Sequence, residues 1–138
     1  MRYDIISERR ARYQAVIKSP ADAYDQLKRY ASKKQEQFLV LTLDGSHTII
    51  RLKLISMGLV NRTIVHPREV FKHAISDAAS SIVIAHNHPS GKLEPSTEDL
   101  EITQRIIAAG DIIGILVLDH IIFAPSGYCS LKELGHIK

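Results

Sequence analysis

An apolar strand leads directly into a polar loop in the segment Ser81-Ile82-Val83-Ile84-Ala85-His86-Asn87-His88-Pro89-Ser90-Gly91. The apolar run before His86 is typical of a strand in the interior of a sheet. Pro89 and Gly91 end that strand and open a loop. His86 and His88 are two residues apart, and side chains along a strand alternate between faces. Both imidazoles are therefore predicted to project to the same side at the end of the strand.

Asp99 follows this loop, in the first turn of a helix that Ser96 can cap. A catalytic zinc site takes three protein ligands and keeps the fourth position for water. A loop rich in Pro and Gly can bring the start of the helix back to the strand end, where Asp99 would be the third ligand. Ser96-x-x-Asp99 also fits a capping box, which would explain Asp99 without a metal. The residues alone leave both interpretations of Asp99 open.

Upstream of this stretch, the pattern predicts a helix, a hairpin and a second helix. Ser19 and Pro20 are typical of a helix start, and apolar spacing carries that helix to about Lys34. Strands over 38–43 and 48–55 are expected on either side of an Asp44-Gly45 turn. After a short strand at 63–65, a helix opens at Pro67, and its expected buried face is formed by Val70, Phe71, Ala74, Ile75 and Ala78.

Downstream, a helix is expected from Ser96 through Ala109, with Gly110 as its C-terminal stop. Strands are expected at Ile112–Leu118 and Ile121–Phe123, followed by a turn at 125–127. Helices and strands thus mix along the chain, which predicts an α/β fold with helices packed on a mixed sheet. The length of 138 residues is typical of a single domain, so we expect one domain over 1–138, with residues 1–18 as a basic N-terminal extension.

Composition excludes several classes of protein. Hydrophobic residues make up 45% and charged residues 24%, which is a globular balance. The single cysteine, Cys129, excludes an internal disulfide framework and a multi-thiolate zinc site. The apolar runs are too short to cross a bilayer, and the N-terminus is polar, so we expect a cytoplasmic protein without membrane association. Residues 1–34 are rich in Lys and Arg, which gives weak support to nucleic-acid binding; a solvated helix face explains the same charge.

The motif His86-x-His88, followed by Ser96 and Asp99, resembles the zinc-binding signature of the JAB/MPN (JAMM) metalloproteases. The sequence around it is similar to the RadC-like branch of that family over roughly Ser19 to Gly135. The segments that carry this second resemblance are Gly58-Leu59-Val60-Asn61, Val65-His66-Pro67-Arg68-Glu69-Val70-Phe71, His86-Asn87-His88-Pro89-Ser90-Gly91, Pro95-Ser96-x-Glu98-Asp99 and Leu118-Asp119-His120-Ile121-Ile122.

The resemblance implies a cytidine-deaminase-like fold with a mixed sheet flanked by helices, and one zinc per chain held by His86, His88 and Asp99. It implies that Ser96 stabilises the oxyanion formed when water attacks a carbonyl, although Ser96 could equally be only the helix N-cap. The family's general base lies where the first helix gives way to the first strand, the place of Glu36. Glu69, in the first turn of a helix, and Glu94, in the loop, are poorer candidates.

The leading hypothesis is a zinc-dependent hydrolase that cleaves an amide bond in a peptide or an isopeptide-linked protein. One alternative is a metal-dependent nuclease or DNA-associated repair factor, because a metal-bound hydroxide could also attack a phosphodiester and residues 1–34 are basic. The RadC-like branch is labelled as DNA repair, but nothing in these residues supports that label. Another is a non-catalytic MPN-type interaction module. A Ser–His–Asp hydrolase built on Asp119 and His120 is disfavoured, since neighbours on a strand face opposite sides. An exposed strand edge would let two copies pair, so a homodimer is a further expectation.

Overall fold

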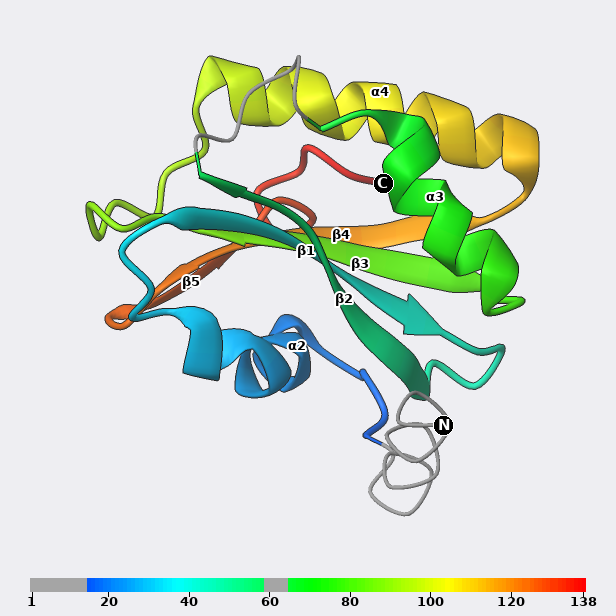
Figure 1. Ribbon diagram of the computed structural model, residues 1–138, viewed down its shortest axis with the longest axis horizontal. Coiled ribbons are helices and arrows are strands. Elements are labelled where there is room, and N and C mark those ends of the chain that lie inside the picture. Colours follow the sequence, from blue (N-terminus) through cyan, green and yellow to red (C-terminus); the bar gives the residue numbers. More distant parts are fainter. Residues whose placement is uncertain (1–14, 59–64) are drawn as a thin grey trace.

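The computed structural model describes residues 15–58 and 65–138 (Figure 1). Its centre is a mixed sheet of five strands in the order β2-β1-β3-β4-β5, in which only β3 and β4 run parallel. In chain order the described elements are α2 (Pro20–Leu27), a short 3₁₀ helix η1 (Lys28–Tyr30), β1 (Glu36–Leu43), β2 (Ile49–Gly58), α3 (Pro67–Ser76), β3 (Ser81–Asn87), α4 (Thr97–Ile113), β4 (Leu116–Ala124) and β5 (Gly127–Ser130).

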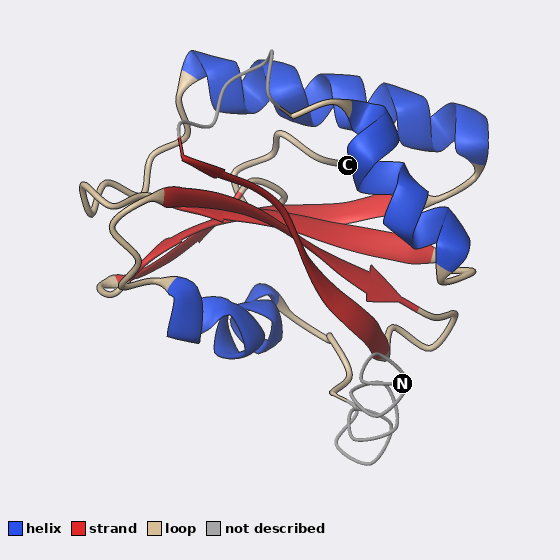
Figure 2. Cartoon of the chain, viewed as in Figure 1, coloured by secondary structure: helices blue, strands red, loops and turns tan. Residues whose placement is uncertain are grey.

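Helices cover both faces of this sheet (Figure 2). Among the described residues, α3 and α4 lie on one face and α2 lies on the other. We call them the α4 face and the α2 face. The arrangement is the mixed α/β architecture, a sheet flanked by helices, that the sequence predicts. Within the described residues, no helix is long and apolar enough to span a bilayer.

Alternation along the central strands separates two apolar cores. On β1 and β3 the even-numbered residues, such as Phe38 and Ile84, pack on the α4 face against α3 and α4. The odd-numbered ones, such as Leu39 and Val83, pack on the α2 face against α2. Because side chains alternate with a period of two, the last residues of β3 also point alternately to the α4 face and the α2 face. His86 therefore faces α4, and Asn87 faces α2.

Strand β4 obeys this alternation only with an interruption. The pairing of β3 with β4 shifts between Ile82 and Val83, whose partners are Val117 and Asp119, so Leu118 has no partner on β3. Val117 packs in the core of the α4 face before the shift, whereas Ile121 packs on the α2 face after it. Such a bulge reverses which side chains point to which face.

Helix α4 is longer than the sequence pattern indicated, and the predicted stop at Gly110 is wrong. The helix continues through Ile113 and ends at Gly114, which has φ 88°. That left-handed conformation is the one that favours glycine at a helix end. Gly110 is required for another reason: a Cβ there would lie 2.5 Å from the backbone oxygen of Ile115 and 3.1 Å from the Phe71 ring. The residue Ile112, which was expected in a strand, is an exposed residue of this helix.

Other boundaries also differ from the expected ones. The first helix is capped by Ser19 as predicted but ends at Leu27, followed by η1 rather than continuing to Lys34. In α3 the predicted buried face loses Ile75, which is 59% exposed. The expected strands at 112–118 and 121–123 are one strand, β4, and the turn at Pro125-Ser126 leads into β5, which the pattern did not indicate. The predicted strand at 63–65 and the basic extension at 1–18 fall mainly on residues outside the described ranges.

Candidate metal centre

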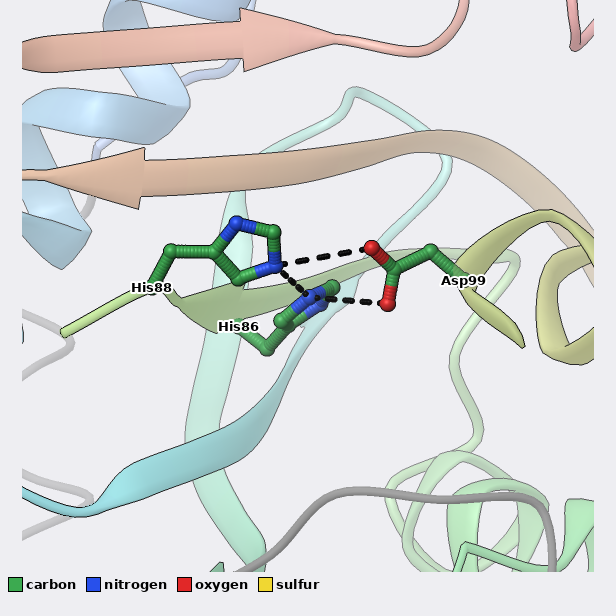
Figure 3. A group of neighbouring side chains, drawn as sticks. All are labelled: His86, His88 and Asp99. Atoms are coloured by element: carbon green, nitrogen blue, oxygen red, sulfur yellow. Dashed lines mark hydrogen bonds and ion pairs between the residues drawn. The ribbon is translucent and has the colours of Figure 1, made fainter. Parts of the chain in front are cut away.

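Two histidines and one aspartate meet at the C-terminal end of β3 (Figure 3). His86 is the second-to-last residue of β3, and His88 directly follows the strand. Asp99 lies in the first turn of α4. The Nε2 atom of His86 is 3.1 Å from Asp99 Oδ1, and that of His88 is 3.4 Å from Asp99 Oδ2. One ligand atom from each residue lies within 4.8 Å of the other two. The structure thus brings together the three residues that the sequence predicted as ligands.

The chemistry of this donor set fits a metal cation. The Nε2 atoms of His86 and His88 are 2.8 Å apart. Two unprotonated ring nitrogens at that distance repel each other, so a proton or a cation has to lie between them. Two imidazole nitrogens and one carboxylate are a ligand set that zinc commonly uses in catalytic sites, with one position left for water. All three side chains are largely buried; the most exposed, His88, is 13% accessible.

The charge on Asp99 reflects its two imidazole neighbours. Burial by itself raises the pKa of a carboxyl group. The neighbouring imidazoles of His86 and His88, helped by the hydrogen bond from the backbone N–H of Ser96, outweigh burial and hold the pKa of Asp99 well below its usual range. In return, the hydrogen bond with Asp99 raises the pKa of His88. The carboxylate is therefore ionised and available to a cation.

Asp99 caps α4 and also lies beside the two imidazoles, so the structure is compatible with both interpretations that the sequence left open. The backbone N–H of Ser96 donates to Asp99 Oδ2 over 2.8 Å, and the backbone N–H of Asp99 donates to Ser96 Oγ over 3.1 Å. These two bonds form the predicted capping box. The same carboxylate keeps both oxygens turned toward the imidazoles. The capping box fixes the side chain in the orientation that a ligand needs.

The ring of His88 is oriented from its far side. Its Nδ1 lies 2.7 Å from the backbone oxygen of Lys92, an acceptor, so Nδ1 carries the proton. This leaves Nε2 free to face Asp99. Metal-binding histidines are generally oriented by such a bond from the other ring nitrogen to a carbonyl or carboxylate. The loop that follows β3 therefore supplies its own support for the second histidine.

His86 is oriented by residues that the sequence analysis did not identify as part of the site. Its Nδ1 lies 2.9 Å from Nε2 of His120 on β4. His120 Nδ1 lies in turn 2.6 Å from the hydroxyl of Thr103 on α4. Complete burial lowers the pKa of His120 well below the ordinary value, so its ring carries one proton. The polar pair Asp119-His120 inside an otherwise apolar strand is the one sequence signal that points to it.

Glu36, the predicted general base, is the first residue of β1. It is two residues before Phe38, which pairs with His86 and whose ring stacks on it with centroids 6.1 Å apart. By alternation Glu36 shares the α4 face with His86. Its negative charge also contributes, after other causes, to the raised pKa of His88. The role of Glu36 as a base stays a prediction.

The start of β1 is held beside the site by Asn87, a second residue whose importance the sequence analysis did not recognise. The buried Asn87 Oδ1 accepts the backbone N–H of Gln37 over 2.6 Å. Its Nδ2 donates to the backbone oxygens of Lys33 and Gln35 over 3.3 and 3.1 Å. These bonds flank Glu36 on both sides in the sequence. Asn87, between the two histidines, therefore fixes the backbone that carries the predicted base.

The remaining candidates lie elsewhere. Glu69 is exposed in the first turn of α3, 3.9 Å from Arg68 Nε, and Glu94 is exposed in the loop before α4. Asp119 faces α2, away from His120, as the adjacency of the two residues on a strand predicted. Its carboxylate accepts hydrogen bonds from the Ser130 hydroxyl over 2.5 Å and from the backbone N–H of Lys132 over 3.0 Å. This pair ties β4 to β5 and the residues after it.

Comparison with known proteins agrees with this geometry. The family model described as the RadC-like JAB domain matches residues 17–136. A UPF0758 protein of Rubrobacter xylanophilus is 51% identical over 121 residues, which cover 87% of this chain and 53% of that protein. A UPF0758 protein of Methanospirillum hungatei is 49% identical over 107 residues, covering 78% of this chain and 48% of that protein. One from Latilactobacillus sakei is 40% identical over 133 residues, covering 96% and 59% respectively.

The chain spans about half the length of the curated relatives it matches. The matched region contains the whole β3–loop–α4 unit, with His86, His88 and Asp99, and also His120 on β4. A family model that covers most of the chain, a mixed sheet flanked by helices and this ligand cluster lead to the same assignment. The chain belongs to the RadC-like JAB domain family.

Proposed function

We propose that this chain is a zinc-dependent hydrolase that cleaves an amide bond in a peptide or an isopeptide-linked protein. One observation carries the proposal: His86, His88 and Asp99 turn Nε2, Nε2 and a carboxylate toward one point, while both histidines use Nδ1 for other partners. That is the arrangement of a ligand set rather than of a structural ion pair. When bound, zinc supplies Lewis acidity that lets water attack a carbonyl near neutral pH.

In this proposal Glu36 accepts the proton of the attacking water and delivers it to the leaving nitrogen. Its place at the start of β1, on the face of His86, supports the role. Ser96 would donate a hydrogen bond to the developing oxyanion. Its Oγ already accepts the N–H of Asp99, but its own hydroxyl proton is not consumed by that bond. Capping and oxyanion stabilisation are therefore compatible.

The experiment combines metal analysis with an activity screen. The purified protein is expected to contain one zinc per chain, and hydrolysis of a peptide or isopeptide substrate should be lost with a chelator and restored by zinc. Single-stranded DNA is included in the same screen. Chelator-sensitive cleavage of DNA alone would replace the amide substrate with a phosphodiester. Stoichiometric zinc without turnover on any substrate would favour the interaction module.

The base is tested by a matched pair of variants. Glu36→Gln should keep zinc and the melting temperature, while turnover falls by a factor on the order of 10²–10⁴. Glu69→Gln is the control, because this exposed carboxylate at the start of α3 meets mainly its own helix dipole. Loss of activity in Glu69→Gln but not in Glu36→Gln would contradict the placement of the base.

A further inference from the structure

We propose that Thr103 and His120 form a positioning relay that fixes which nitrogen of His86 faces the metal. The inference rests on the proposed zinc site and extends it to two residues that do not touch a metal. The relay starts at the Thr103 hydroxyl, which lies 2.6 Å from the backbone oxygen of Asp99. It continues 2.6 Å to His120 Nδ1 and ends with 2.9 Å between His120 Nε2 and His86 Nδ1. Thr103 and His120 are fully buried and His86 is 1% exposed.

The direction of the protons follows from the first bond. A backbone oxygen can only accept, so the single hydroxyl proton of Thr103 is donated to Asp99. The Thr103 oxygen can then only accept from His120, which places the His120 proton on Nδ1. With that proton on Nδ1, His120 Nε2 is the acceptor for the Nδ1–H of His86 over 2.9 Å. His86 Nε2 therefore keeps its lone pair, on the side where His88 and Asp99 lie.

The relay excludes the opposite arrangement of the protons on His120 and His86. If His120 carried its proton on Nε2, it would donate to His86 Nδ1, and the His86 proton would move to Nε2. That proton would then occupy the space between His86 and His88, whose Nε2 atoms are 2.8 Å apart. The site would hold a proton in place of a metal. The hydroxyl of Thr103 thus selects between two states of a ligand that it does not touch.

The relay also links two ligands through one helix. Thr103 lies one turn after Asp99 on α4 and bonds its backbone oxygen, so the same turn holds the carboxylate ligand and orients His86. His120 reaches Thr103 only because the irregularity at Leu118 turns it, and not Asp119, toward the α4 face. Outer-shell partners of metal ligands typically change metal affinity by about 10–100-fold when removed. We assign that class of effect to Thr103 and His120.

The test reads the histidine ring protons directly. Long-range ¹H–¹⁵N correlation spectra of ¹⁵N-histidine protein should show His120 protonated on Nδ1, both without metal and with zinc. In Thr103→Val, which keeps the side-chain shape but removes the hydroxyl, the His120 proton should move to Nε2 and the zinc Kd should rise about 10–100-fold. Thr103→Ser restores the hydroxyl and should restore both readouts.

Thr42→Val is the matched control for the loss of a buried hydroxyl. Thr42 is also fully buried, and its hydroxyl donates to Asp77 Oδ2 over 2.9 Å. This variant should lower the melting temperature while zinc Kd and the His120 tautomer stay unchanged. Nδ1–H absent from His120 in the wild type, or equal zinc Kd in Thr103→Val and Thr42→Val, would overturn the relay.

The proposed function can fail separately. A wild-type protein that binds no zinc would contradict the hydrolase, whereas the tautomer of His120 in that same metal-free sample still supports or overturns the relay. Should Thr103→Val not fold, the wild-type spectrum and the Thr103→Ser variant decide. In Thr103→Ser an unchanged Nδ1–H on His120 supports the relay, and its loss contradicts it.

Discussion

Asp99 and Asp119 are both buried aspartates, each 6% exposed, and they lie on opposite faces of the sheet. Each accepts at least one hydrogen bond from a backbone N–H group. Their pKa values nevertheless move in opposite directions. The pKa of Asp99 is held well below its usual range, whereas burial raises the pKa of Asp119 in spite of the hydrogen bonds from Ser130, Lys132 and His120.

The difference lies in the partners rather than in the burial. Asp119 receives a hydroxyl and two backbone N–H groups, all of them neutral. Asp99 faces two imidazoles that can carry positive charge. At Asp119 the neutral donors lower the pKa by less than burial raises it, whereas at Asp99 the two imidazoles more than offset burial. A buried carboxylate therefore indicates a metal site only when its neighbours can share or replace positive charge.

The largest expected effect is on zinc affinity when each carboxylate becomes an amide. Asp99→Asn can still accept the Ser96 N–H but loses its charge, so zinc affinity should fall by more than the roughly 10–100-fold typical of an outer-shell change. The melting temperature should change little by comparison. Asp119→Asn is the control and should bind zinc as the wild type does, measured by competition with a chromophoric chelator. Equal losses in the two variants would break the comparison.

The next effect is on folding. Asp119→Ala removes the acceptor of the Ser130 hydroxyl and of two backbone N–H groups. Leaving buried donors unpaired should cost about 2–3 kcal/mol of unfolding free energy, measured by chemical denaturation. Zinc affinity should be unchanged, because these bonds lie on the α2 face. Weaker zinc binding with normal stability would show that Asp119 acts on the site after all.

A smaller effect is expected from the hydroxyl that caps α4. Ser96→Ala should lower the unfolding free energy by about 1 kcal/mol, because the N–H of Asp99 loses its acceptor. Ser96→Gly should cost only a few tenths of a kcal/mol, since glycine is tolerated at this position. Zinc should stay bound in both. A loss of turnover much larger than the loss of stability would add the oxyanion role to the cap.

The smallest effect is a pH dependence of the metal-free protein. The hydrogen bond with Asp99 raises the pKa of His88 above 6.5, so this pair stabilises the fold below about pH 6.5. That contribution is lost as pH rises through the raised pKa. The melting temperature of metal-free protein should therefore fall above pH 6.5, and His88→Gln should show a smaller fall. Zinc replaces the proton, so the fall should also shrink in zinc-loaded protein.

The sequence predicted the parts of the fold that local patterns determine. The spacing of His86 and His88 on an apolar strand and the capping pattern at Ser96 were sufficient to place the ligands on their elements. Gly110 misled the prediction of the α4 end, because its small size allows the close approach of the Ile115 backbone oxygen and the Phe71 ring and does not mark a helix stop. Nothing local distinguishes these two uses of glycine.

The outer part of the site could not be predicted for a different reason. Thr103 and His120 meet only through a pairing between α4 and β4, and the face of His120 depends on an irregularity at Leu118. A bulge is a property of how two strands pair, and a single strand's sequence does not reveal it. Asn87 was visible between the histidines, but its bonds reach Lys33 and Gln35 across a large sequence separation.

The unpaired Leu118 has a consequence for insertions and deletions. Losing one residue before the pairing of Val83 with Asp119 would remove the irregularity and leave the strand downstream in place. The pairs of Ser81 with Leu116 and of Ile82 with Val117 would keep their register, because Leu118 is the residue without a partner on β3. Deleting Leu118 should therefore keep zinc binding, whereas deleting Ile121 should abolish it by shifting the chain around His120. Leu118 is thus dispensable for the pairing of β4 with β3, and it lies two residues before His120.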